Sequence, residues 1–245
     1  MKGRRSISIG TSGWYYEHWR GPFYPQGLDK GKFLSYYASH FETVEINNTF
    51  YQLPKRETLF HWRDTTPAGF IFSVKASRFI THMKKLKGPD KALPPFFKTM
   101  EMLQGKMGPI IFQLPPAWRF NGDRFEVFLK ALPREFRYAF EFRDPTWFNP
   151  QAYEAMAKHG VAFCIYELGG RVSPQEVTTD FVYLRLHGPQ GPYQGQYSTE
   201  VLTGWAKSFS AWTQQGKKIF CYFDNDQEGY AAQDALKLKK IIQEG

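Results

Sequence analysis

The stretch Phe181-Val182-Tyr183-Leu184-Arg185-Leu186-His187 has the length and the alternation of one β-strand. Successive side chains of a strand point to opposite faces, so this run has an apolar face and a polar face. The apolar face consists of Val182, Leu184 and Leu186. The polar face consists of Tyr183, Arg185 and His187. Polar side chains that collect toward the C-terminal end of a buried strand predict a barrel whose mouth is built for chemistry.

Similar short runs recur along the chain, separated by stretches with helical spacing. The expected strands are Ser6–Gly10, Thr43–Asn47, Phe70–Lys75, Pro109–Leu114, Tyr138–Phe142, Val161–Tyr166, Phe181–His187 and Ile219–Asp224. The clearest expected helices are Gly31–His40, Arg124–Leu132 and Gly229–Gln243. This alternation predicts an α/β fold of the (β/α)8 TIM-barrel type, as one domain over residues 1–245. A doubly wound open sheet is the alternative, although it usually has fewer strands.

The composition of the 245 residues, 42% hydrophobic and 18% aromatic, suffices for a large core. The chain has no run of about 18 apolar residues, and its basic start, Met1–Ser6, lacks the apolar region of a secretory signal. We therefore expect a cytoplasmic protein with no membrane partner. Cys164 and Cys221 lie in apolar runs, which predicts two buried thiols and argues against a disulfide scaffold or a structural zinc site.

The formal charge of +9 and the pI near 9.4 favour an anionic partner such as phosphate or nucleic acid. Basic residues cluster between Lys75 and Lys91, in either a solvated loop or a phosphate track. A second candidate is the glycine-rich loop His187–Gly195, which precedes a helix with Ser198 as N-cap. Phosphate often binds at this position in such barrels, but the loop matches no phosphate-binding motif and is also consistent with simple flexibility.

The alternation divides each strand into an apolar helix-facing set and an interior set that is largely polar. The interior set consists of Ser8, Glu45, Asn47, Ser73, Lys75, Gln113, Glu141, Arg143, Arg185 and His187, joined by Tyr222 and Asp224 if the last strand keeps this parity. These side chains come from different strands at comparable depths, so we expect them to meet. Buried charges must pair or shift their pKa values, which leaves two outcomes. One is a closed structural network, and the other is a site with a carboxylate poised as general acid or base.

Three segments at or beyond the strand ends add further candidates. In Glu141–Trp147, Arg143 could grip a phosphate or carboxylate and Trp147 could stack a sugar or base, or both could simply pack. Asp224-Asn225-Asp226 resembles a hard-metal ligand group and could hold magnesium with Glu45 or Glu141, but it lacks EF-hand spacing, and we assign no metal ligand or cofactor. The aromatics of the long segment Thr11–Pro25 could form a pocket wall.

The sequence resembles the YecE-like family, domain of unknown function 72, over nearly its whole length. The motifs that carry the resemblance are Gly10-Thr11-Ser12-Gly13-Trp14, Val44-Glu45-Ile46-Asn47-Asn48-Thr49-Phe50-Tyr51, Phe72-Ser73-Val74-Lys75, Phe112-Gln113-Leu114-Pro115-Pro116, Glu141-Phe142-Arg143, Tyr183-Leu184-Arg185-Leu186-His187-Gly188 and Tyr222-Phe223-Asp224-Asn225. The resemblance implies a (β/α)8-type barrel distantly similar to xylose-isomerase-like barrels, which include metal-dependent endonucleases. It implies no agreed activity, and this chain lacks the several strand-end histidines of a trinuclear zinc nuclease.

We therefore predict an enzyme that uses carboxylate general acid/base chemistry, for hydrolysis or isomerisation, on an anionic, phosphorylated or sugar-containing substrate. The predicted catalytic residues are Glu45, Glu141, His187 and Asp224. The predicted substrate-binding residues are Trp14, Tyr15, Asn47, Asn48, Tyr51, Lys75, Gln113, Arg143, Trp147 and Arg185. The alternatives are a protein that binds or processes nucleic acid and a structural protein that acts through a partner surface. The sequence leaves the oligomeric state open.

Overall fold

The computed structural model describes residues 6–244, so the basic start Met1–Arg5 lies outside the described residues. Strands and helices follow one another in the order of a (β/α)8 TIM-type barrel, which confirms the predicted fold class. The chain forms two compact units. Unit 1 comprises the chain up to Glu45, Ile165–Gln175 and the chain from Asp180 onward. Unit 2 comprises Ile46–Cys164 and Glu176–Thr179.

Unit 1 is built on parallel strands with β9 between β1 and β8. Its strands are β1 (Ile7–Thr11), β2 (Thr43–Ile46, whose last residue belongs to unit 2), the second half of β6 (Ala162–Leu168), β7 (Arg171–Val172), β8 (Phe181–Leu186) and β9 (Lys218–Phe223). Its helices are α1 (Phe33–His40), α6 (Thr199–Gln214) and α7 (Tyr230–Glu244). Every residue of β8 is buried, as expected of a parallel strand covered on both faces.

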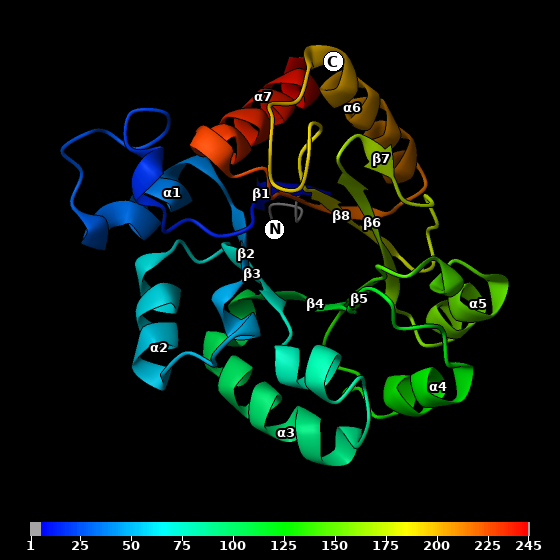
Figure 1. The fold of residues 1–245 in the computed structure, drawn as a ribbon. Coiled ribbons are helices and arrows are strands. Elements are labelled where there is room, and N and C mark those ends of the chain that lie inside the picture. The colour runs from blue at the N-terminus through cyan, green and yellow to red at the C-terminus, as the bar shows by residue number, and fades with distance from the viewer. Residues whose placement is uncertain (1–5, 245) are drawn as a thin grey trace. The chain divides into compact units, whose positions relative to one another are not determined.

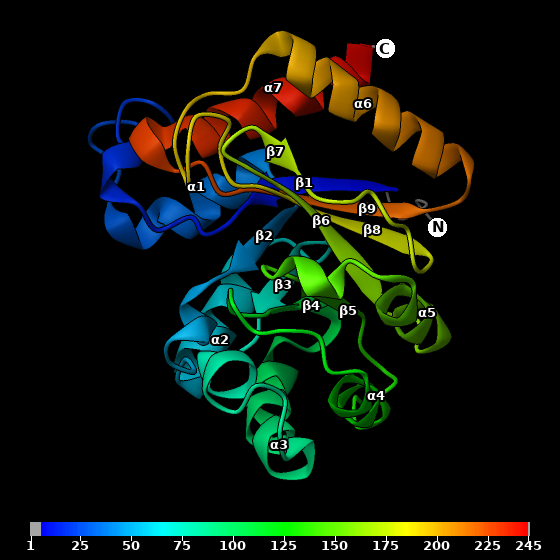
Figure 2. The same cartoon turned by 45° about the vertical axis from the view of Figure 1, so that its right-hand side comes forward.

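Helices α6 and α7 lie side by side and cover the β1–β9 part of unit 1 (Figure 1; Figure 2). Ala231, Ala235 and Leu238 are buried along one side of the last helix, α7. Ser198 caps α6 as predicted, because its side chain accepts a hydrogen bond from the Val201 amide at 3.3 Å.

Unit 2 contains three parallel strands in the order β5-β4-β3, and the start of β6 pairs with β5. The strands are β3 (Ile71–Lys75), β4 (Met107–Gln113) and β5 (Tyr138–Glu141), and the helices are α2 (Arg56–Thr65), α3 (Pro89–Met100), α4 (Gly122–Lys130) and α5 (Pro150–Lys158). Aromatic rings fill its core: Phe140 stacks on Phe112 at 5.0 Å and meets Phe125 edge-on at 5.1 Å.

All eight predicted strands are present, with boundaries shifted by no more than two residues. The prediction missed β7, a two-residue strand that pairs with β6 through a turn at Gly169 and Gly170, both at positive φ. Cys164 and Cys221 are both buried, as expected. Within residues 6–244, no helix combines the length and hydrophobicity needed to cross a membrane.

Candidate active site

Glu45, at the end of β2, is the most heavily hydrogen-bonded carboxylate of unit 1. It is fully buried and accepts hydrogen bonds from Ser12 Oγ at 2.7 Å and Tyr183 Oη at 2.6 Å. Arg185 donates to Glu45 Oε1 from Nε at 3.1 Å and from Nη2 at 2.8 Å. Both oxygens of Glu45 therefore accept hydrogen bonds and its negative charge is compensated by Arg185, while the catalytic role predicted for Glu45 stays a prediction.

Arg185 links Glu45 to a second carboxylate, Asp224. Its Nη2 lies 3.1 Å from Asp224 Oδ2, and that same oxygen lies 2.9 Å from His187 Nδ1. Arg185 and His187 are at most 1% exposed, whereas the Asp224 side chain is 12% exposed. The result is a continuous chain of charge-assisted hydrogen bonds with its one accessible end at Asp224.

The register of β8 and β9 explains why these groups meet. Arg185 is level with Tyr222 and Leu186 with Phe223, so Asp224 follows at the strand end beside His187. The Asp224 amide donates to the Leu186 carbonyl at 2.8 Å and continues the ladder by one residue. The expected parity of the last strand is thereby confirmed, because Asp224 meets Arg185.

The loop that follows His187 is tied to the interior of unit 1. Gly188 adopts φ 114°, and a side-chain carbon there would lie 2.4 Å from the carbonyl oxygen of Gln194, so only glycine fits. The buried Asn225 donates to the Gly195 carbonyl at 2.9 Å. The Tyr193 ring meets the His187 imidazole edge-on at 5.8 Å, which places this loop directly against the buried network.

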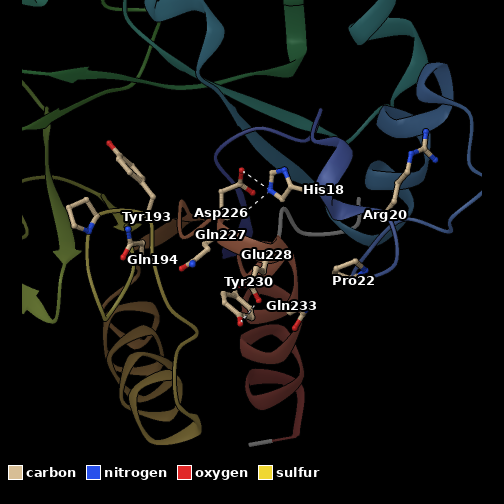
Figure 3. A pocket seen from close by; sticks show the side chains of 11 residues that line it. His18, Arg20, Pro22, Tyr193, Gln194, Asp226, Gln227, Glu228, Tyr230 and Gln233 are labelled. Carbon is tan, nitrogen blue, oxygen red and sulfur yellow. Dashed lines mark hydrogen bonds and ion pairs between the residues drawn. The ribbon is translucent and has the colours of Figure 1, made fainter.

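A pocket of about 910 Å³ opens in unit 1 beside this loop. Its lining comes from the segment after β1, the loop after β8, the loop after β9 and the start of α7 (Figure 3): His18, Arg20, Pro22, Pro192, Tyr193, Gln194, Asp226, Gln227, Glu228, Tyr230 and Gln233. The volume is in the range of small-molecule sites.

Asp226 is the most perturbed acid of the pocket. Burial, reinforced by the negative charge of Asp224, raises the pKa of Asp226 from 3.8 to about 6, against a lowering contribution from Trp19 and His18. Trp19 Nε1 donates to Asp226 Oδ1 at 2.5 Å, and His18 Nε2 lies 3.3 Å from Oδ2. Figure 3 shows the His18 and Asp226 side chains pointing toward each other. This carboxyl group can therefore exchange a proton near neutral pH.

The other charged groups of the pocket wall are engaged locally. Arg20 Nε donates to Glu17 Oε2 at 2.9 Å, and its Nη1 donates to the Gln26 carbonyl at 2.9 Å. Tyr230 Oη donates to Glu228 Oε2 at 3.0 Å. These contacts fix the wall and direct Arg20 away from Asp226 (Figure 3).

In unit 2, the predicted residues Glu141 and Arg143 form a buried ion pair with each other. Glu141 also lies near Cys164, whose Sγ is 3.9 Å from Oε2. Trp147 is 1% exposed, stacks on Phe142 at 4.6 Å and donates to the Trp118 carbonyl at 2.7 Å, so its indole is part of the core. That Glu45 and Glu141, which belong to different units, share one site stays a prediction.

The remaining predicted binding residues differ in exposure. Trp14 is buried and accepts a hydrogen bond from Tyr24 through its carbonyl, whereas Tyr15 is 61% exposed. Tyr51 is 74% exposed and Asn48 is exposed. Asn47, Lys75 and Gln113 are half-buried. Their roles in binding stay predictions.

Sequence reasoning did not name His18 or Gln194 as site residues. Three segments that it singled out nevertheless contribute to the pocket wall: Thr11–Pro25 supplies His18, the glycine-rich loop His187–Gly195 supplies Gln194, and the acidic strand end supplies Asp226. No three His, Cys, Asp or Glu side chains within residues 6–244 are grouped as a metal site requires.

The model of "Protein of unknown function DUF72" matches residues 8–245. The chain belongs to the DUF72 family. It is 35% identical to the UPF0759 protein YecE of Escherichia coli K12 over 132 residues, which are 52% of this chain and 47% of YecE, so the match spans about half of that protein's length. It is 26% identical to the UPF0759 protein YunF of Bacillus subtilis over 96% of this chain and 94% of YunF.

Crystal structures of two DUF72 proteins share the fold. The Thermotoga maritima protein TM1631 superposes with a TM-score of 0.87 at 29% identity, covering 97% of this chain and 99% of TM1631. The Enterococcus faecalis protein EF0366 superposes with a TM-score of 0.82 at 20% identity, covering 97% and 95% of the two chains. Both likenesses agree with the TIM-type barrel.

Proposed function

We propose that this DUF72 protein is an enzyme that uses carboxylate general acid/base chemistry in the pocket of unit 1. The observation that carries the proposal is Asp226, whose pKa is raised to about 6 while its carboxyl group faces His18 in the pocket. A proton-transfer group works best when its pKa lies near the operating pH. Asp226 therefore donates a proton to the substrate and recovers it within one cycle.

The buried network positions this acid. Asp224 precedes Asp226 by two residues, and its charge raises the pKa of Asp226. Arg185 and His187 hold the Asp224 carboxylate in place from β8. Two neighbouring carboxyl groups in different environments are the usual arrangement for dividing acid and base roles, so we assign the base role to Asp224.

The substrate is a small sugar-containing molecule. Gln194, Gln227 and Gln233 offer both donors and acceptors to hydroxyl groups, and the half-exposed Tyr193 ring can cover an apolar sugar face. Arg20, the permanent cation of the wall, is engaged by Glu17, which favours hydroxyl groups over the polyanionic substrate expected from net charge. Both hydrolysis and isomerisation of such a substrate are consistent with a carboxyl acid and a carboxylate base. We also propose that the protein is cytoplasmic, as expected from the sequence.

The test is a panel of free sugars and aryl glycosides followed by proton NMR, with wild-type protein, Asp226→Asn and the exposed control Asp64→Asn. We expect one class of sugar to react, with a loss of about 100-fold or more in Asp226→Asn and full activity in Asp64→Asn. Retained turnover in Asp226→Asn contradicts the proposal, and so does a panel in which no sugar binds or reacts.

A further inference from the structure

Unit 2 carries a basic segment that runs from the end of β3 into the first turn of α3, two elements labelled in Figure 1. Its exposed cations are Arg78, Lys84, Lys85, Lys87 and Lys91, against one acid in the same segment, Asp90. The enzyme mechanism proposed above uses none of them. Such a density of cations on one short segment is typical of a surface that binds a polyanion.

The backbone holds this segment in a defined shape. Residues Phe79–Met83 form a π-helical turn, closed by the Lys84 amide donating to the Phe79 carbonyl at 2.8 Å. The chain then reverses through Lys85 and Leu86, both at positive φ, while Leu86 itself is 1% exposed. A bulky residue keeps that conformation only where its surroundings impose it. The lysines therefore project from a fixed turn.

Aromatic side chains are exposed on the same surface. Phe79 is 42% exposed and Tyr51 is 74% exposed. The ring of Phe50 connects the two segments, because it meets Tyr51 at 5.1 Å and His82 at 4.9 Å, edge-on in both contacts. The rings of Tyr51 and Phe79 are thus exposed to solvent near the cations, although burial of such large rings would be favourable.

Cations and rings are also in direct contact here. Lys84 Nζ lies 5.4 Å from the centre of the Phe79 ring, and Lys75 Nζ lies 4.5 Å from that of Phe50. Partial burial, together with the positive charges of Lys75 and Arg78, lowers the pKa of His82. These cations therefore produce a positive electrostatic potential around the rings of Phe50 and Phe79.

We propose that this surface, defined by Tyr51, Arg78, Phe79, Lys84, Lys85 and Lys87, binds single-stranded nucleic acid. Unpaired bases stack on the exposed rings while the cations follow the phosphates. A duplex offers the phosphates but hides its base faces, so it uses the cations alone. An anionic membrane would engage the lysines, yet the turn exposes only Phe79 and Met83 as large apolar side chains between Ser77 and Lys91.

The first experiment measures binding of the whole protein to a fluorescein-labelled single strand of about 20 nucleotides, as DNA and as RNA, between about 50 and 200 mM salt. The triple variant Lys84→Gln/Lys85→Gln/Lys87→Gln should lower the slope of log affinity against log salt by about 2. Phe79→Ala and Tyr51→Ala should each weaken single-strand binding by about 5-fold or more and leave duplex binding unchanged.

The matched control, Lys130→Gln/Lys207→Gln/Lys240→Gln, removes the same charge from exposed positions in α4, α6 and α7. Equal losses in the two triple variants overturn the proposal, since they would show non-specific attraction. Duplex binding as tight as single-strand binding overturns it as well, as does binding to phosphatidylserine vesicles without binding to oligonucleotides. The Asp226→Asn variant should bind nucleic acid normally, so this result is independent of the pocket.

Discussion

The two units of this DUF72 protein differ in where their charged side chains lie. Unit 1 buries Glu45, Arg185 and His187 in one hydrogen-bonded chain that ends beside an open pocket. Unit 2 keeps most of its cations on the surface and fills its core with stacked and edge-on rings, with the pair Glu141 and Arg143 inside. The enzyme chemistry proposed above uses the pocket of unit 1, and the proposed nucleic-acid binding uses the surface of unit 2.

Replacing Arg185 should have the largest effect in unit 1. Arg185→Met leaves Glu45 and Asp224 without their shared cation and should destabilise the protein by about 3–5 kcal/mol in urea denaturation. Arg63→Met is the control, because Arg63 pairs with Asp64 at the surface. A loss for Arg185→Met no greater than for Arg63→Met would mean that the buried network does not stabilise unit 1.

Unit 2 should be equally sensitive to the loss of one ring. Phe140→Ala removes a fully buried side chain that contacts Phe112 and Phe125, and should cost about 3–5 kcal/mol through lost contacts and a cavity. The same urea titration measures it. The exposed Phe79→Ala should cost far less, and similar losses for both variants would contradict the division between core and surface rings.

Tyr183→Phe should show a smaller effect that isolates one hydrogen bond of the network. The variant removes the hydroxyl that donates to Glu45 Oε2 at 2.6 Å while preserving the ring. Hydrogen bonds to buried charged groups are worth about 1.5–3 kcal/mol, and we expect a loss in that range. Tyr138→Phe, whose hydroxyl donates to a neutral carbonyl, is the control and should lose less.

Asp226→Asn should change the stability with the opposite sign. The raised pKa means that the folded protein favours the protonated carboxyl, so this stability is present below the ordinary pKa of 3.8 and is lost as pH rises through about 6. Since asparagine carries no charge and a pKa raised from 3.8 to about 6 corresponds to about 3 kcal/mol, the variant should be more stable than wild type by up to about 3 kcal/mol above pH 6. Thermal denaturation from pH 4 to 8 measures the gain, which should fall below about 1 kcal/mol at pH 4.

The strand pattern predicts most of the fold, because the face to which a strand side chain points depends only on its position along that strand. The alternation in Phe181–His187 and at Asp224 is sufficient to place Arg185, His187 and Asp224 together. The pocket could not be derived in the same way. His18 and Asp226 meet because the long segment after β1 brings the side chains of His18 and Trp19 against Asp226, which is more than 200 residues away in the sequence. Trp147 and Arg185 are buried, and their contact with a ligand stays a prediction.

The most direct test of the account is the ionisation of Asp226. Carbon-13 NMR of the aspartate carboxyl groups during a pH titration, with Asp226→Asn to identify the signal, reports the pKa of this group in the folded protein. The account predicts a midpoint of about 6, raised by burial and by Asp224. A midpoint at the ordinary value of 3.8 would contradict it, because Asp226 would then be fully ionised at neutral pH and would have no proton to donate.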